Sequence, residues 1–196
     1  MKKRLIKIFI LSIILYLFCL LNVSYAVTPT FSYKCSRGTN IKYYINEGEQ
    51  NVFQQNKHIE NACKNWVHTG FGYNPIYMTK VYSSKGTAID FYTARTSRWN
   101  DDNVLAETVH CNGYDNRVNP DSQNWLYSKI YLSLDSLAPN PYYAKIQGTI
   151  AHEIGHAFGL KHYNNNPYSI MCQVAYGRKV ETVQKEDSDA INQKYN

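Results

Sequence analysis

Residues 152–162 read HEIGHAFGLKH and hold three of the six histidines in a chain of 196 residues. On a helix, residues four apart lie one turn apart on the same face, so His152 and His156 would direct two imidazoles toward one point. Glu153 is rotated by about a quarter-turn from His152 and would lie beside that point. Gly159 lets the backbone leave the helix sharply, so that His162 can return as a third nitrogen.

Three neutral imidazoles and one water complete a tetrahedral zinc site, and an open fourth position is typical of a catalytic ion. Glu153 would lie near that open side, where a carboxylate can act as a general base. The spacing leaves two other interpretations. One is a helix whose histidines are surface or capping residues, and the other is a zinc site that binds metal without catalysis. The spacing of all five fixed positions favours the catalytic ion.

The fixed positions match HExxHxxGxxH, the long zinc signature of the metzincin metallopeptidases: His152, Glu153, His156, Gly159 and His162. Met171 follows at a distance that fits the methionine turn beneath the metal in that group. Among metzincins the chain resembles the matrixins, with looser matches in IKYYI, IENACKNW, DNVLAETVH and EDSDAINQKY. The resemblance implies an α/β (α+β) metzincin-like catalytic domain, with a mixed twisted sheet, two long helices and a C-terminal helix.

The same resemblance implies a secreted zinc-dependent endopeptidase with one catalytic zinc ion and Glu153 as general base. Its protein or peptide substrate would lie extended against an edge strand formed by residues 103–108. The stretch MCQVAYGRKVE after Met171 would form the wall of the pocket for the substrate residue after the scissile bond. Two other functions stay open: a secreted binding or adhesion module with a vestigial zinc site, and a zinc hydrolase of a non-peptide amide.

The resemblance to matrixins raises two further features, calcium sites and a cysteine switch. The loops NDDN (100–103) and DNRVNPD (115–121) could supply oxygen ligands to calcium, or they could be solvated loop carboxylates. The sequence YKCSRG around Cys35 does not match the cysteine-switch motif, so latency through a Cys35 thiolate stays a minor alternative.

Residues 1–26 have the three-part pattern of a secretory signal peptide: a basic start, an apolar run over 8–21, and small Ser24 and Ala26 before a cut. A retained membrane anchor over 5–23 is the alternative. We therefore expect a catalytic domain over 27–196 that is secreted, extracellular, monomeric and not stably associated with a membrane. Without the four basic residues of the segment, 17 basic side chains face 15 acidic ones. This balance gives no reason to expect nucleic acid as a partner.

Four cysteines remain after residue 26. An even number in an exported protein predicts two disulfides, with three connectivities to choose from. The alternative is four separate buried thiols. The four are Cys35, Cys63, Cys111 and Cys172.

Hydrophobic periodicity predicts the remaining elements. An amphipathic helix of about four turns is expected within 51–70, a second helix should follow Pro139 and Pro141 and run through the motif, and a closing helix should begin near Val183 or Glu186. Strands are expected at 41–45, 76–82, 88–92, 103–110 and 128–134.

Overall fold

Side-chain alternation decides which face each strand turns to the core. In β1 (Asn40–Ile45) the side chains of Ile41, Tyr43 and Ile45 are buried, while those between them face outward.

The computed structural model describes residues 27–46, 55–137 and 143–196. The other strands are β2 (Tyr77–Val81), β3 (Ile89–Ala94), β4 (Ala106–Cys111) and β5 (Tyr127–Ser133).

The five strands form one sheet in the order β2-β1-β3-β5-β4. β1 pairs in parallel with β2 and β3, and β3 pairs in parallel with β5. β4 is the antiparallel member, with Thr108 opposite Ile130 of β5. Within the described ranges no strand pairs with the other side of β4, so this strand is an edge.

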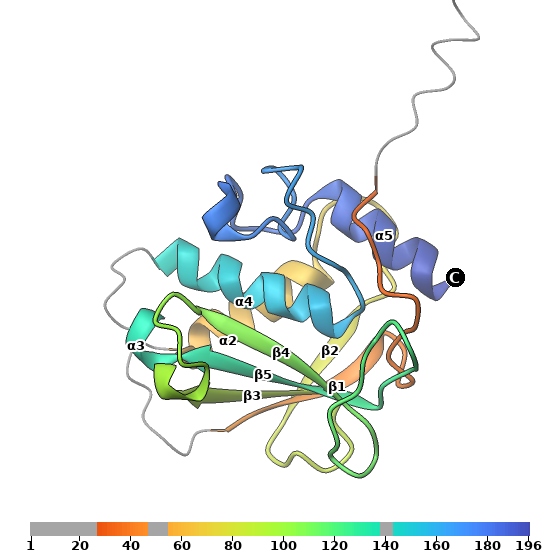
Figure 1. Cartoon of the computed structure of the whole chain (residues 1–196). Coiled ribbons are helices and arrows are strands. Elements are labelled where there is room, and N and C mark those ends of the chain that lie inside the picture. Colours follow the sequence, from red (N-terminus) through yellow and green to blue (C-terminus); the bar gives the residue numbers. More distant parts are fainter. Residues whose placement is uncertain (1–26, 47–54, 138–142) are drawn as a thin grey trace, which may run out of the picture.

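Helices α2 (Gln55–Val67) and α4 (Tyr143–Ala157) pack against each other and cover the sheet (Figure 1). Two buried tryptophans attach to α4 through hydrogen bonds. The indole Nε1 of Trp66 in α2 donates to the Ala151 carbonyl at 2.8 Å, and that of Trp125 donates to the Ala157 carbonyl at 3.2 Å. α4, which carries most of the quoted stretch, is therefore fixed at two points along its length.

The fold agrees with the predicted class, a mixed α/β sheet with two long helices and a closing helix, α5 (Lys185–Tyr195). Each predicted strand is present within three residues of its expected ends. Three short elements were not predicted: α3 (Leu134–Leu137) and the 3-10 turns η1 (Thr96–Arg98) and η2 (Val174–Tyr176).

Several predictions lie outside the described residues: the signal peptide at 1–26, the first residues of the first predicted helix, and the prolines at 139 and 141. In the part of the chain that the structure describes, no helix is both long and apolar enough to cross a membrane.

The prediction of two disulfides is wrong in this structure, where the four cysteines are separate buried thiols. They lie on different elements, and each sulfur has its own neighbour. Cys63 of α2, for example, shares a hydrogen bond with Tyr43 of β1. Burial, the largest cause for each, raises the pKa of all four thiols, which disfavours the reactive thiolate.

Candidate metal centre and cleft

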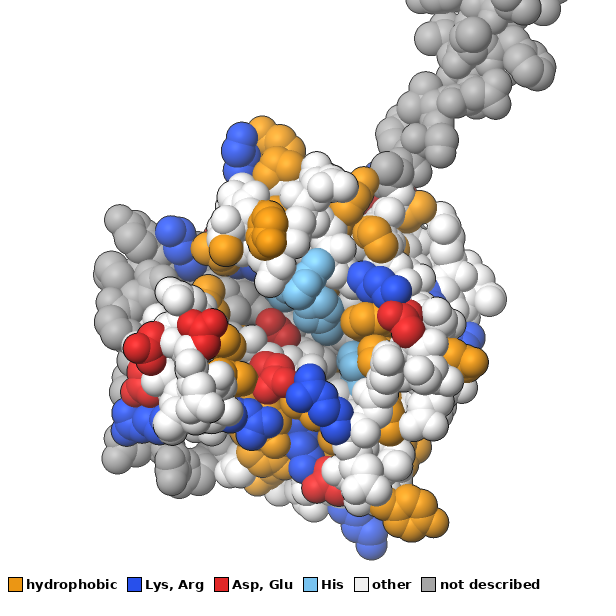
Figure 2. Space-filling model, in the orientation of Figure 1, with side chains coloured by type: hydrophobic (Ala, Val, Ile, Leu, Met, Phe, Trp, Pro, Cys, Tyr) orange, Lys and Arg blue, Asp and Glu red, His pale blue; other side chains and the backbone are white. Residues whose placement is uncertain are grey.

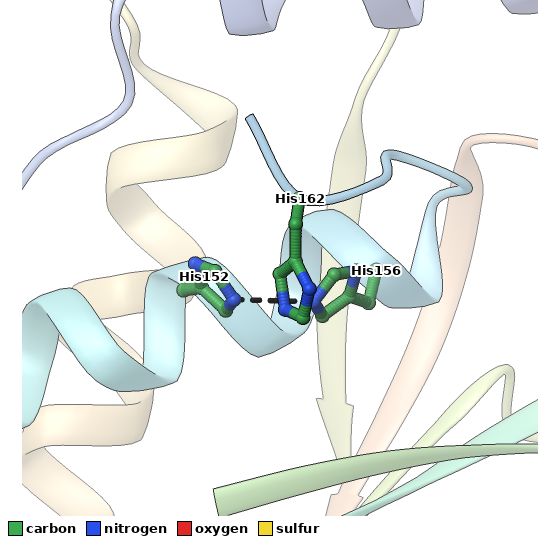
Figure 3. Close-up of side chains that lie close together, drawn as sticks. All are labelled: His152, His156 and His162. Atoms are coloured by element: carbon green, nitrogen blue, oxygen red, sulfur yellow. Dashed lines mark hydrogen bonds between the residues drawn. The ribbon is translucent and has the colours of Figure 1, made fainter. Parts of the chain in front are cut away.

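The three histidines of the quoted stretch converge. His152 and His156 project from successive turns of α4, and His162 reaches the same point from the segment after the helix (Figure 3). One ring nitrogen from each lies within 4.8 Å of the others, and among the described residues this is the group with metal-ligand spacing. The Nε2 atoms of His152 and His156 are 3.1 Å apart.

Hydrogen bonds on the far side of two rings decide which nitrogen faces the centre. Nδ1 of His152 lies 2.8 Å from the Ile170 carbonyl, and Nδ1 of His156 lies 2.8 Å from the Leu160 carbonyl. A carbonyl can only accept, so both Nδ1 atoms carry the hydrogen and both Nε2 atoms of the neutral rings present lone pairs. The contact in Figure 3 between these Nε2 atoms is therefore not a hydrogen bond between neutral rings.

Two lone pairs that face each other at this distance repel, and a cation held between or beside them would turn this repulsion into two bonds. Two nitrogens bound to one tetrahedral zinc ion lie roughly 3.3 Å apart, given Zn–N bonds of about 2.0–2.1 Å. The observed 3.1 Å is close to that value. Burial, the largest cause for each ring, lowers the pKa of His156 and His162 to about 4 and that of His152 well below its usual value. All three rings are thus neutral at pH 7, as ligands must be, so the cluster fits zinc.

Gly159 turns the chain back so that His162 can reach the cluster. Its φ of +102° lies in the left-handed region. The amide of Leu160 bonds to the Gly155 carbonyl at 2.9 Å and that of Gly159 to the His156 carbonyl at 2.8 Å. This pair of bonds is a Schellman motif, which ends α4.

Met171 packs beneath the helix, as the resemblance implied. Its side chain is fully buried, and its backbone carbonyl accepts from the amide of Tyr163 at 2.9 Å. Gly155 makes room for it, because a Cβ at that position would overlap the Met171 sulfur and lie 3.1 Å from Cζ2 of Trp66.

Gly155→Ala is expected to destabilise the protein by about 1–3 kcal/mol, the usual result of overpacking. In an exposed helix the same change would instead stabilise by about 1 kcal/mol. Urea unfolding of both proteins measures the difference. If the clash with Met171 is the cause, Met171→Ala should lower the free energy of unfolding less in the Gly155→Ala protein than in the unsubstituted protein. Equal losses in the two proteins would contradict this assignment.

A buried carboxylate supports the carbonyl that orients His152. Asp187 of α5 is fully buried and accepts from the amide of Ile170 at 2.9 Å. It also accepts from the hydroxyl of Thr28 at 2.6 Å and from the amide of Gln184 at 3.0 Å. α5 and the N-terminal described segment therefore hold the turn whose carbonyl positions the first histidine.

Glu153 lies in the cleft beside the cluster and is almost fully buried. Its Oε2 atom lies 2.6 Å from the hydroxyl of Thr108 on edge strand β4. Burial raises the pKa of Glu153 to about 7, and the Thr108 hydrogen bond acts in the opposite direction. The carboxyl group can therefore both take up and release a proton near neutral pH.

A cavity of about 840 Å³ contains the histidine cluster and Glu153. β4 and the loop before it form one wall, and residues 173–175 with Arg178 form another. Figure 2 shows the pale-blue histidines on the floor of a hollow in this face, with acidic side chains nearby. The cleft is large enough to take several residues of an extended chain.

Comparison with protein families matches the matrixin family over residues 34–196. The chain is a matrixin. Membership makes it a zinc metallopeptidase in general terms, and the expected fold class agrees with the structure. A search of curated proteins found no match.

In this matrixin the four residues predicted from the signature are brought together around one point. Thr108 and Arg178 lie in the stretches predicted as the edge strand and the pocket wall, but their individual contacts were not predicted, and Asp187 was not predicted at all. Thr108 lies 45 positions from Glu153, and no spacing signal links them. Asp187 is likewise a single residue without a motif, which only the fold places behind the turn that orients His152.

Of the two loops that could bind calcium, the one at 115–121 uses its aspartates to bind lysines. Asp115 accepts from Lys129 at 2.7 Å, and Asp121 forms an ion pair with Lys161 at 2.9 Å. Asp101 instead accepts from Asn103 within its own loop. Calcium binding by this matrixin stays a prediction.

Proposed function

We propose that this matrixin is a secreted endopeptidase that hydrolyses peptide bonds of extracellular proteins. His152, His156 and His162 would hold one catalytic zinc ion, and Glu153 would be the general base. The observation that carries the proposal is the pair of facing Nε2 lone pairs at 3.1 Å, in a cleft that also holds the Glu153 carboxylate. Zinc, when bound there, polarises a carbonyl and lowers the pKa of its water to near 7.

The residues of the chain would then move the proton. Glu153 accepts a proton from the attacking water and passes it to the nitrogen of the leaving amine. Its position is held by Thr108 at 2.6 Å, so the base stays beside the histidines throughout. Burial of the carboxylate keeps bulk water from competing for the proton.

The outer side of β4, up to His110, whose carbonyl accepts from the amide of Val118, is the proposed substrate platform. Residues 103–108, predicted as the edge, line the cleft, and the observed strand spans Ala106–Cys111. An edge strand presents unpaired backbone groups, and an extended peptide can pair with them as an added strand. A cleft open along this edge suits cleavage within a chain. We expect the protein to act as a monomer without nucleic acid or a stable membrane association.

The full chain, including residues 1–26, should be expressed in a secreting host and recovered from the medium. N-terminal sequencing tests cleavage after Ala26. The recovered protein is then incubated with a diverse peptide library, with and without a zinc chelator, and the cuts are mapped by mass spectrometry. Chelator-sensitive cuts within peptides support the proposal. Stoichiometric zinc with no cut peptide would favour a binding module or hydrolysis of a different amide.

Thr108→Val should shift the acid limb of the pH profile of kcat/KM upward. The Thr108 hydrogen bond stabilises the ionised form of Glu153, so its loss raises the pKa of that base. A charge-assisted hydrogen bond of about 1.5–3 kcal/mol corresponds to a shift of about one unit or more. Thr108→Ser keeps the hydroxyl and serves as the control. An unshifted profile for the valine variant would show that Thr108 does not support the base.

A further inference from the structure

The cleft carries a solvent-exposed arginine close to β4. Arg117 lines the cavity, and its side chain is 69% exposed. Its Nη1 atom lies 3.1 Å from Oε1 of Glu107 on β4, whose own side chain is 23% exposed. Of these two charged groups, the guanidinium is therefore the more accessible to a molecule in the cleft.

The carboxylate of Glu107 has other partners besides Arg117. Its Oε2 atom accepts from the indole Nε1 of Trp99 at 2.9 Å and lies 3.5 Å from Nε of Arg98. The guanidinium of Arg98 in turn lies over the ring of Tyr131, 3.5 Å from its centroid. Because exposed ion pairs are weak, Arg117 can turn to another carboxylate while Glu107 keeps its two other partners.

The backbone of Arg117 lies beside the outer side of β4. Cys111 and Arg117 form an antiparallel bridge, and the amide of Val118 donates to the His110 carbonyl at 2.9 Å. Toward Ala106, no segment of the described ranges pairs with this side of the strand. A substrate strand that pairs with β4 there would therefore lie in line with the bridge, with Arg117 beyond one of its ends.

The side chain of Arg117 reaches back along β4 toward the place of the substrate. Its backbone lies beside Cys111, but its guanidinium contacts Glu107, four residues earlier in the strand. Side chains alternate along a strand, so Glu107 points away from the face on which Thr108 contacts Glu153. The cut bond lies beside Glu153. At roughly 3.3 Å per residue, the substrate residue near the guanidinium is about two to four residues from that bond.

We propose that Arg117 makes this enzyme prefer an acidic side chain at one substrate residue, about two to four positions from the cut bond. The substrate carboxylate would pair with the exposed guanidinium, which would repel a lysine at the same place. Arg117 would act on the binding of the substrate and take no part in the proton transfer. This inference rests on the proposed peptidase function and names the substrates that this function favours.

The test uses peptides built around one bond that the library experiment identifies. A single residue two, three or four positions from that bond, on either side, is Glu, Gln or Lys. At one of these positions the zinc-loaded wild-type protein should prefer Glu to Gln and Gln to Lys. Its kcat/KM should be roughly 3–10-fold higher for Glu than for Lys, because opposite charges on neighbouring strands attract and like charges repel. The preference should shrink in high salt, since the guanidinium is exposed.

Arg117→Glu reverses the charge at an exposed position, and it should reverse the order of the peptides, so that Lys ranks above Glu. Arg117→Gln should remove the preference. A residue that only supports its loop can change the cleavage of all peptides together, but it cannot reverse this order. Arg95→Glu is the matched control, because Arg95 is also 69% exposed, pairs with one carboxylate and does not line the cleft. This control should keep the wild-type preference.

The outcomes separate the two proposals. If the zinc-loaded wild-type protein cuts no peptide of any kind, the peptidase function fails and the inference fails with it. If it cuts peptides but treats Glu, Gln and Lys alike at every position tested, only the acidic preference is overturned. A preference for Glu that persists unchanged in Arg117→Glu would also overturn it.

Discussion

Glu153→Gln is expected to lower kcat/KM by at least ~10²–10⁴-fold while the protein keeps its zinc, because an amide cannot accept the proton of the attacking water. The change preserves the size of the side chain, and the Thr108 hydroxyl can still donate to the amide oxygen, so the cleft should keep its shape. Peptide cleavage measures the rate, and atomic absorption measures the zinc content of the same sample.

Glu60→Gln is the matched control for this experiment. Glu60 is partly exposed on α2, where it pairs with Lys80, and it does not line the cleft. Its substitution should leave both the rate of peptide cleavage and the zinc content unchanged. Activity of Glu153→Gln at the level of this control would mean that another group accepts the proton and that the catalytic assignment is wrong.

His162→Ala should remove most of the bound zinc and, with it, the activity. Loss of a residue that only hydrogen-bonds to a metal ligand already weakens metal affinity by about 10–100-fold. Loss of a ligand itself should weaken zinc affinity by more. The histidine side chain is exposed and lies after the helix, so the metal-free variant should fold. Zinc raises the melting temperature of a protein that binds it only in the folded state. The variant should keep the metal-free Tm and lose this rise.

His68→Ala serves as its control, because His68 is also exposed and does not belong to the cluster. Zinc content and the zinc-dependent rise in Tm should match those of the unsubstituted protein. Stoichiometric zinc in His162→Ala would show that the third ligand lies elsewhere in the chain.

These experiments test assignments that the order of residues already suggested. His152, Glu153 and His156 lie within a single helical stretch, and their relative directions follow from helix geometry alone. Gly159 marks where that helix ends, since a positive φ there costs a glycine little. The strand positions were likewise predictable from alternation, which is a local property.

The disulfide prediction failed because the number of cysteines does not say where each thiol lies in the fold. In the structure the four thiols occupy separate places in the core. The order of strands is equally non-local. β5 pairs with β3 on one side and with β4 on the other, and this order leaves β4 at the edge of the sheet, beside the histidines.

The sequence by itself therefore determined the three imidazoles, the neighbouring carboxylate and the helix that carries them, because contacts within eleven residues are set by backbone geometry. Only the tertiary structure decided which contacts surround them: Thr108 with Glu153, Asp187 with the turn that orients His152, and Arg178 with Glu181 in the cleft wall. Those contacts join residues on different elements. They form because the helices pack on the sheet, and this packing cannot be derived from the spacing of residues along the chain.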